Sequence, residues 1–208
     1  FSKFITTKTS ISNNKISVVG SPKISLSKYL CKNKKNSNTI GFVGRFSATN
    51  DFMQRSSLFT TIERTRNHDI YATGAIGELQ VLNVYLSIIK KLMDETNFNI
   101  SIRPHPNEKF DSWRILKDMY GERVSISSNK EDFLEWMITV DSIVTTPSTS
   151  MIEPLLNNIP VISVDKITDS STVHLYYEEM LSGFLNAAIR PNNIEELFQC
   201  IISKEKHI

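Results

Sequence analysis

The feature that most constrains the fold is a regular alternation of short apolar runs with segments of helical periodicity. The apolar runs are TIGFVG at 39–44, NISI at 99–102, RVSIS at 123–127, SIVTT at 142–146 and PVISV at 160–164. Runs of this length are typical of strands buried in a parallel sheet. No Asn-Gly hairpin signal separates them. The pattern therefore predicts an α/β fold, a doubly wound parallel sheet of the Rossmann-like type.

The segments between these runs predict crossover helices. In the clearest one, Leu79, Leu82, Leu86, Ile89 and Met93 recur at spacings of three and four, which predicts an amphipathic helix with this face toward the core. Further helices are expected at 110–119, 132–138, 150–157, 176–181 and 194–203, the last capped by Asn192 or Asn193. Short strands at 16–20 and 185–189 and a polar insertion at 45–77 complete the prediction.

Composition excludes several classes of protein. The chain has 208 residues, 40% of them hydrophobic, and a net charge of +2, which argues against global disorder and gives no basic face for nucleic acid. Apolar runs of about five residues are far too short to span a bilayer, and the Ser/Thr-rich start lacks the apolar centre of a secretory signal. Two cysteines, Cys31 and Cys200, exclude a disulfide framework and a cysteine zinc site. We expect a cytoplasmic location, with peripheral contact to the membrane face still open, and no metal or cofactor.

Candidate site residues follow the predicted strands, because ligands of such sheets bind beyond the carboxyl ends of the strands. Gly44 lets a ligand approach the backbone, and Arg45 can donate hydrogen bonds to an anion, although a solvated loop is equally compatible. The next strand leads into RPHPNE at 103–108, where prolines on both sides fix the backbone of His105 beside Arg103. A histidine held there can meet a phosphate or protonate a leaving oxygen; the alternative is a structural turn.

A third group of polar residues follows the strand at 142–146. Ser148, Thr149 and Ser150 stand at a predicted helix start, where they either bind an anion or cap the helix. Glu153 either closes a capping box with Ser150 or accepts hydrogen bonds from a sugar hydroxyl. His68 and His174 are interpreted as surface or packed residues.

These motifs together resemble the C-terminal half of two-Rossmann-domain (GT-B) glycosyltransferases. The resemblance is carried by RPHPNE, by the Ser/Thr-rich turn with Glu153, by NNIPVISVD at 157–165 and by KISVVGSPKIS at 15–25. It is greatest for families that build bacterial surface carbohydrate such as capsule and lipopolysaccharide. They include Kdo and sialic acid transferases with His-Pro motifs, and the CDP-glycerol glycerophosphotransferases.

The resemblance implies a metal-independent transferase domain that binds a nucleotide-activated sugar, CMP- or CDP-linked, for surface polysaccharide synthesis. His105 would contact the donor phosphate and assist departure of the nucleotide. The phosphate contacts implied are Gly44, Arg45, Arg103, Ser148, Thr149 and Ser150, and the ribose or nucleotide contacts are Glu153 and Glu108. The acceptor would be a carbohydrate or a lipid-linked sugar.

The resemblance also implies a division of the chain. Residues 1–38 would be a segment and linker arriving from a preceding N-terminal Rossmann domain, and residues 39–208 the donor-binding domain. Because the chain begins at Phe1, we expect it to be part of a longer protein whose other half holds the acceptor site and the catalytic base.

Two alternatives stay open. Enzymes of the UDP-GlcNAc 2-epimerase type share this fold and a His-Pro turn, but they more often carry Gly-Gly where this chain has the turn Ser148-Thr149-Ser150. A non-catalytic module that binds a nucleotide or another anion is the second alternative.

Overall fold

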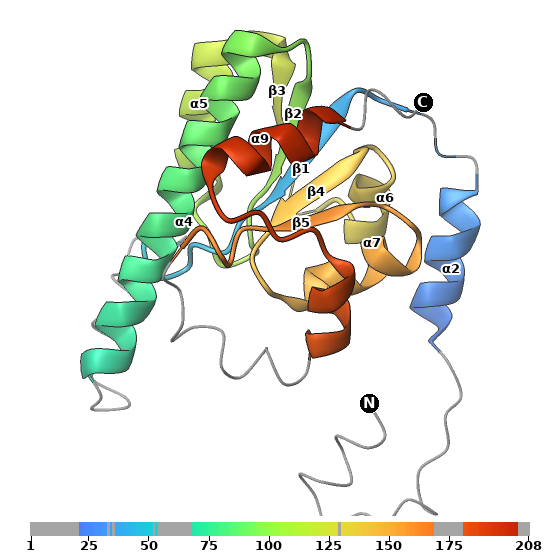
Figure 1. Ribbon diagram of the computed structural model, residues 1–208, viewed down its shortest axis with the longest axis horizontal. Helices are drawn as coiled ribbons and strands as arrows, with labels where there is room; N and C mark the ends of the chain where they lie inside the picture. Colours follow the sequence, from blue (N-terminus) through green and yellow to red (C-terminus); the bar gives the residue numbers. More distant parts are fainter. Residues whose placement is uncertain are drawn as a thin grey trace, which may run out of the picture.

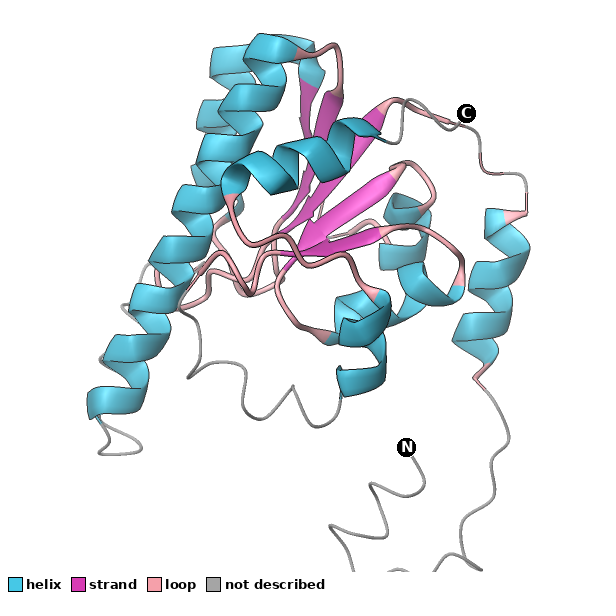
Figure 2. Ribbon diagram, viewed as in Figure 1, coloured by secondary structure: helices cyan, strands magenta, loops and turns pink. Residues whose placement is uncertain are grey.

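The computed structural model describes residues 21–32, 34, 36–51, 53, 68–128, 130–168 and 181–203. The described part is built on a five-stranded parallel sheet with the order β3-β2-β1-β4-β5, and helices cover both of its faces (Figures 1 and 2). The strands are β1 (Thr39–Val43), β2 (Asn99–Arg103), β3 (Val124–Ile126), β4 (Ser142–Thr145) and β5 (Val161–Ser163). This confirms the predicted doubly wound α/β fold.

The helices divide between two layers. They are α2 (Pro22–Cys31), α4 (His68–Glu95), α5 (Arg114–Tyr120), α6 (Phe133–Met137), α7 (Ile152–Leu156) and α9 (Ile194–Ile202), with short 3-10 turns η2 (Phe110–Trp113), η3 (Gly121–Arg123) and η4 (Thr149–Met151). Residues 181–187 are also helical. Helices α4, α5 and α9 share one buried cluster with β1 and β2, whereas α6 packs with β4 and the end of α2 in a second cluster.

The strand order places the reversal of winding between β1 and β4. The chain runs from β1 to β2 to β3 in one direction, returns to β4 on the other side of β1, and continues to β5. Phe42 of β1 is in register with Ile102 of β2 on one side and Val144 of β4 on the other. The loops that leave β1, β2 and β4 therefore meet at one edge of the sheet, with the β1 loop in the centre.

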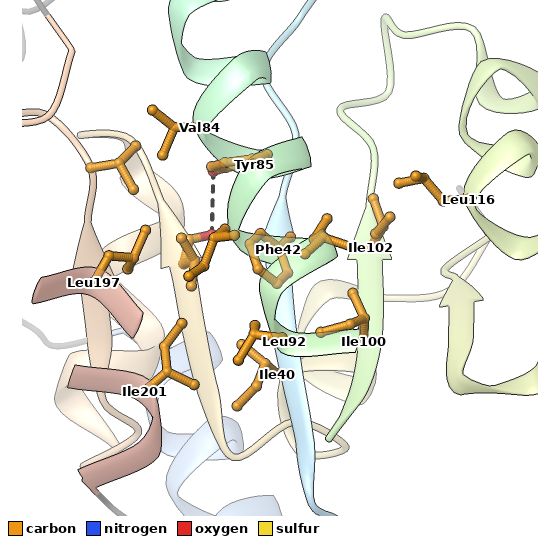
Figure 3. Close-up of a cluster of buried hydrophobic side chains, with 14 of the residues drawn as sticks. Ile40, Phe42, Val84, Tyr85, Leu92, Ile100, Ile102, Leu116, Leu197 and Ile201 are labelled. Carbon is orange, nitrogen blue, oxygen red and sulfur yellow. Dashed lines mark hydrogen bonds between the residues drawn. The ribbon is translucent and has the colours of Figure 1, made fainter. Parts of the chain in front are cut away.

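Helix α4 confirms the predicted helix but turns a different face to the sheet. Ile89 and Met93 are buried and Leu82 is half-buried as expected, whereas Leu79 and Leu86 are 53% and 41% exposed. The buried stripe consists of Val81, Val84, Tyr85, Ile88, Ile89, Leu92 and Met93; Figure 3 labels Val84, Tyr85 and Leu92. Apolar residues of α4 lie on more than one of its faces, so the apolar periodicity alone could not indicate which face packs on the sheet.

Tyr85 explains the orientation of α4. Its hydroxyl donates to the carbonyl oxygens of Val43 at 2.9 Å and Val144 at 3.3 Å, at the carboxyl ends of β1 and β4. Its ring meets Phe42 edge-on, with 5.2 Å between ring centroids. Because both acceptors of this buried hydroxyl lie on the sheet, the hydroxyl fixes which face of the helix lies inward.

On the opposite face, the Trp136 ring of α6 lies directly against β1. A Cβ atom on Gly41 would come within 2.9 Å of the Trp136 ring, so only glycine allows this contact. The indole Nε1 donates to Ser101 Oγ on β2 at 2.8 Å. Trp136 therefore packs against β1 and hydrogen-bonds to β2, and so joins these two neighbouring strands on this face of the sheet.

Helix α2 was not predicted. It lies inside the segment 1–38, and it docks on α7, where Asn157 Nδ2 donates to Ser27 Oγ at 2.8 Å. The weak apolar periodicity of α2 explains the omission, because Leu26 and Tyr29 are exposed and only Ser27 is buried. The chain after it is tied down where Asp141 accepts from Lys34 Nζ at 2.9 Å.

Three further expectations meet the structure at the ends of elements. The predicted strand at 185–189 is wrong: residues 181–187 are helical and only Ile189 forms a single bridge, to Ile162. The polar insertion 45–77 ends earlier than predicted, since α4 already begins at His68. The cap of α9 is confirmed as Asn193, whose Oδ1 accepts from the Glu196 N–H at 2.8 Å.

Some expectations fall outside the described residues. These are the strand at 16–20, most of the helix at 176–181, and the residue His174; for His68 only the helical backbone is described. Within the described ranges, no helix combines the length and the apolar character that crossing a bilayer requires.

Candidate functional site

The candidate site lies at the carboxyl ends of β1, β2 and β4. Arg45, the second residue after β1, extends its guanidinium across the reversal point, and its Nη1 donates to the carbonyl oxygen of Pro147 at 3.1 Å. This bond joins the loop after β1 to the Ser/Thr-rich turn after β4. Two of the three predicted groups are thus brought together at the position where ligands of doubly wound sheets bind.

His105 supplies the third group, from the turn after β2. Its Nδ1 accepts a hydrogen bond from the Asn107 N–H at 3.2 Å, so in the neutral ring the proton is on Nε2. Burial, together with the positive charge of Arg45, lowers the pKa of His105 below its ordinary value. The ring is therefore a neutral hydrogen-bond donor next to a cation.

The hydroxyls of Ser148 and Ser150 face each other, with 2.6 Å between their Oγ atoms. Ser148 stands at the cap position of η4 but its side chain makes no capping bond there. Because one hydroxyl donates to the other, the second keeps its proton for another acceptor. The pair thus offers a donor at the ligand edge that capping of η4 does not use.

Glu153 lies one turn further along. Its Oε1 forms an ion pair with Lys23 Nζ of α2 at 3.0 Å, and the Glu153 side chain is 15% exposed. The capping box considered from the sequence would require its carboxylate at Ser150, and Glu153 is instead paired with Lys23.

Glu108 has a different setting from the ribose contact that the resemblance implied. Its side chain is 3% exposed, and Oε1 accepts from the backbone N–H of Phe46 at 3.1 Å and of His105 at 2.9 Å. Oε2 accepts from Trp113 Nε1 at 2.9 Å. Burial raises the pKa of Glu108 even though these donors act in the opposite direction. The carboxylate therefore ties the β1 loop to the β2 turn from inside the protein.

Arg103 is also directed away from the site. Its Nη1 donates to Ser127 Oγ at 2.7 Å and its Nη2 to the Glu131 carbonyl at 2.8 Å, both on the chain after β3. The guanidinium stacks over Phe133 and Trp136, at 5.6 and 5.8 Å from the ring centroids. Arg103 thus stabilises the β2–β3 side of the sheet, and the structure does not bring it together with Arg45.

Sequence reasoning missed Glu78, which belongs to the N-terminal half of α4. Its carboxylate accepts from the N–H groups of Ala48 and Thr49 at 2.9 and 3.0 Å, and from Thr49 Oγ1 at 3.1 Å. Burial raises the pKa of Glu78 to about 7, with a smaller contribution from the charge of Glu108. The available signal was an isolated acid in the apolar segment ATGAIGELQ, which did not reveal its partner on a loop thirty residues away in the sequence.

Aromatic packing in the core anchors the loop after β1. The Phe46 ring lies against Tyr85 and Trp113, with centroid separations of 5.7 and 5.5 Å. Phe46 is 1% exposed, so the residue next to Arg45 is anchored in the core. Because the Phe46 side chain is anchored in the core, the backbone of the neighbouring residue Arg45 is held in a fixed position.

Neither metal nor disulfide chemistry is indicated by the described residues. Among them, no group of three or more His, Cys, Asp or Glu side chains is placed to hold a metal ion. Neither Cys31 nor Cys200 forms a disulfide.

Comparisons with known proteins relate this fold to a nucleotide-sugar enzyme. No family model matches the chain, and no curated protein matches it either. Two solved structures of the UDP-GlcNAc 2-epimerase of Methanocaldococcus jannaschii share the fold. One, in complex with UDP-GlcNAc and UDP, has 14% identity and a TM-score of 0.50 over 96% of this chain; the other has 13% identity and a TM-score of 0.51 over 96%.

The extent of this similarity defines what it shows. The chain spans 50% and 51% of the length of the two epimerase chains. At this identity, the similarity shows a common fold. It agrees with the parallel, doubly wound sheet and with one half of a GT-B-like architecture.

Proposed function

We propose that this chain binds the phosphate-bearing part of a nucleotide sugar, as the donor-binding half of a GT-B-type glycosyltransferase. The observation that carries the proposal is the bond from Arg45 to the Pro147 carbonyl, made across the reversal point between β1 and β4. The carbonyl that accepts this bond belongs to the residue before Ser148, whose hydroxyl is paired with that of Ser150. The positive charge of Arg45 also contributes to the lowered pKa of His105.

These groups match the chemistry of a phosphate ligand. A guanidinium has five N–H donors in a planar fork, and phosphate oxygens are strong acceptors for such donors. His105 Nε2 and a serine hydroxyl add neutral donors. In a transfer reaction, negative charge builds on the nucleotide phosphate as it departs, and donors held in advance at that position stabilise it. His105 is the group we propose to assist the departure.

The finer assignment rests on the resemblance in sequence. RPHPNE and the Ser-Thr-Ser turn support a CMP- or CDP-linked donor and a role in surface polysaccharide synthesis, at the cytoplasmic face of the membrane. Glu153 is the proposed ribose contact, in exchange for its ion pair with Lys23. Thr149 and the Gly44 backbone complete the proposed phosphate contacts. The acceptor, a carbohydrate or a lipid-linked sugar, would be held by a second Rossmann domain.

A second candidate is an enzyme of the UDP-GlcNAc 2-epimerase type. The fold shared with the two epimerase structures favours it. The Ser-Thr-Ser turn at 148–150, in place of the Gly-Gly pair more common in that family, favours the transferase.

Calorimetric titration with CMP, CDP and UDP separates these functions. The transferase proposal expects a preference for cytidine nucleotides and weaker binding of all three in His105→Ala, whereas a preference for uridine would support the epimerase type. The variant Arg45→Gln should weaken binding of any of the three nucleotides. Its matched control is Arg114→Gln on α5, where the arginine side chain is 71% exposed. Absence of binding to all three nucleotides would contradict both enzymes.

A further inference from the structure

Two carboxylates, the buried Glu108 and the half-buried Glu78, hold the loop that carries Arg45. Glu78 accepts from the N–H groups of Ala48 and Thr49, and Glu108 accepts from the N–H group of Phe46. One carboxylate comes from α4 and the other from the turn after β2, so the loop is held from both sides. The backbone that follows Arg45 is therefore held at three N–H groups between Phe46 and Thr49.

Glu108 also connects this loop to His105. The same oxygen, Oε1, accepts from both the Phe46 N–H and the His105 N–H. The Asn50 side chain extends the connection, because its Nδ2 donates to the Lys109 carbonyl at 3.1 Å. The relative position of Arg45 and His105 is thus set by one buried carboxylate.

Two charged glutamates at these positions are not the choice that would give the folded chain its highest stability. Burial raises the pKa of both glutamates, which means that the cost of removing each charge from water exceeds the gain from its hydrogen bonds. Charges kept in the interior at such a cost are found preferentially at functional sites. A purely structural connection could use a neutral side chain.

We propose that Glu78 and Glu108 are positioning residues, a two-carboxylate clamp that holds Arg45 and His105 in the geometry for binding phosphate. The proposal rests on the proposed function of the same edge and names the residues that set its geometry. Neither carboxylate contacts the ligand; each acts through the backbone that it holds.

The donors around Glu78 show what a charged acceptor adds at this position, because hydrogen bonds to an ionised oxygen are stronger than those to a neutral one. Oε2 of Glu78 accepts from three donors, two N–H groups and the Thr49 hydroxyl, and the Ala48 N–H also reaches Oε1 at 3.2 Å. A glutamine offers one neutral carbonyl oxygen at the position of Oε2, and its NH2 group would replace Oε1, the second acceptor of the Ala48 N–H. Glu78→Gln therefore keeps the size of the side chain, removes the charge and weakens the hydrogen bonds that hold Ala48 and Thr49.

The test compares nucleotide affinity with stability in the same variants. Glu78→Gln and Glu108→Gln are measured by calorimetry with whichever of CMP, CDP or UDP binds the wild-type chain, and by urea unfolding at pH 8. The control is Glu95→Gln at the far end of the same helix, where the glutamate side chain is 54% exposed. We expect affinity to fall about tenfold in Glu78→Gln, while stability at pH 8 stays equal or rises and the control changes neither.

Equal or tighter binding in both variants would overturn the clamp, because the carboxylates would then only repel the ligand or serve folding. Should Glu108→Gln fail to fold, Thr49→Val gives a second test, since it removes only one donor to Glu78 and should weaken binding by a smaller factor. A wild-type chain that binds no nucleotide would refute the proposed function and the clamp together. A wild-type chain that binds while the variants are unaffected would refute the clamp alone.

Discussion

The Glu108 carboxylate occupies the space that a side chain on Gly44 would need. A Cβ atom on Gly44 would lie 2.6 Å from Oε1 and 3.1 Å from Oε2 of Glu108. The N–H group of Gly44 donates to the Arg103 carbonyl at 2.8 Å, which continues the β1–β2 pairing to this point. The glycine after β1 therefore allows a buried carboxylate to reach the backbone of two loops at once.

Gly44→Ala tests this relationship. The added methyl group must displace the Glu108 carboxylate, so the bonds to the N–H groups of Phe46 and His105 lengthen or break. We expect a loss of about 1–3 kcal/mol in unfolding free energy, together with weaker nucleotide binding. Gly183→Ala is the matched control, because a Cβ atom there meets nothing within 4 Å. Equal stability of the two variants in urea unfolding would contradict the assigned contact.

Sequence reasoning located the strands because their ends carry strong local signals. Gly44, Pro104 and Pro147 each stop an apolar run within about two residues of where the strand ends in the structure. It also selected Arg45, His105 and the serines at 148 and 150, since the end of a parallel strand follows directly from the fold class.

What the sequence could not supply is the direction of each side chain. Arg103 and Glu108 share the RPHPNE motif with His105, yet one stacks on Trp136 and the other enters the core, because their partners come from distant segments. The same is true of Glu78, because its hydrogen-bond partners lie on the loop after β1 and are brought to it by tertiary packing. Leu79 was placed in the core by periodicity and is exposed, because the hydroxyl of Tyr85 selected another face of the helix.

Tyr85→Phe should destabilise the protein without removing any apolar packing. The lost hydroxyl leaves the carbonyls of Val43 and Val144 without this donor at the reversal point. We expect about 1–2 kcal/mol of lost stability in denaturant unfolding. Tyr29→Phe on α2 is the control, because its side chain is 69% exposed and should change stability by less than about 0.5 kcal/mol. A loss as large in the control would refute the assigned role.

The pH dependence of stability should report Glu78. Its pKa in the folded chain, about 7, lies above the ordinary value of 4.5, so the folded chain holds this proton more tightly than the unfolded chain does. The stability contributed by the neutral acid is fully present below pH 4.5 and is lost as pH rises through about 7. Relative to Glu78→Gln, the wild type should lose on the order of 1–3 kcal/mol between pH 5 and pH 8. A difference that stays constant between these pH values would show that Glu78 has an ordinary pKa.

His105 should titrate below the ordinary histidine range. Burial and the charge of Arg45 both lower the pKa of its ring from 6.5. Titration followed by NMR should therefore show an upward shift of the His105 pKa in Arg45→Gln and no shift in Arg114→Gln. A His105 pKa that is unchanged by the loss of Arg45 would mean that the two groups are not neighbours.

The most direct test of the central claim is to map nucleotide binding by amide NMR shifts in the isotope-labelled chain. With CDP or UDP added, the account predicts that the largest changes fall in three segments, 44–50, 105–108 and 147–150. Residues at the opposite end of the strands, such as Ser37 and Asp141, should change little. Shifts centred on that opposite end, or no shifts with either nucleotide, would contradict the account.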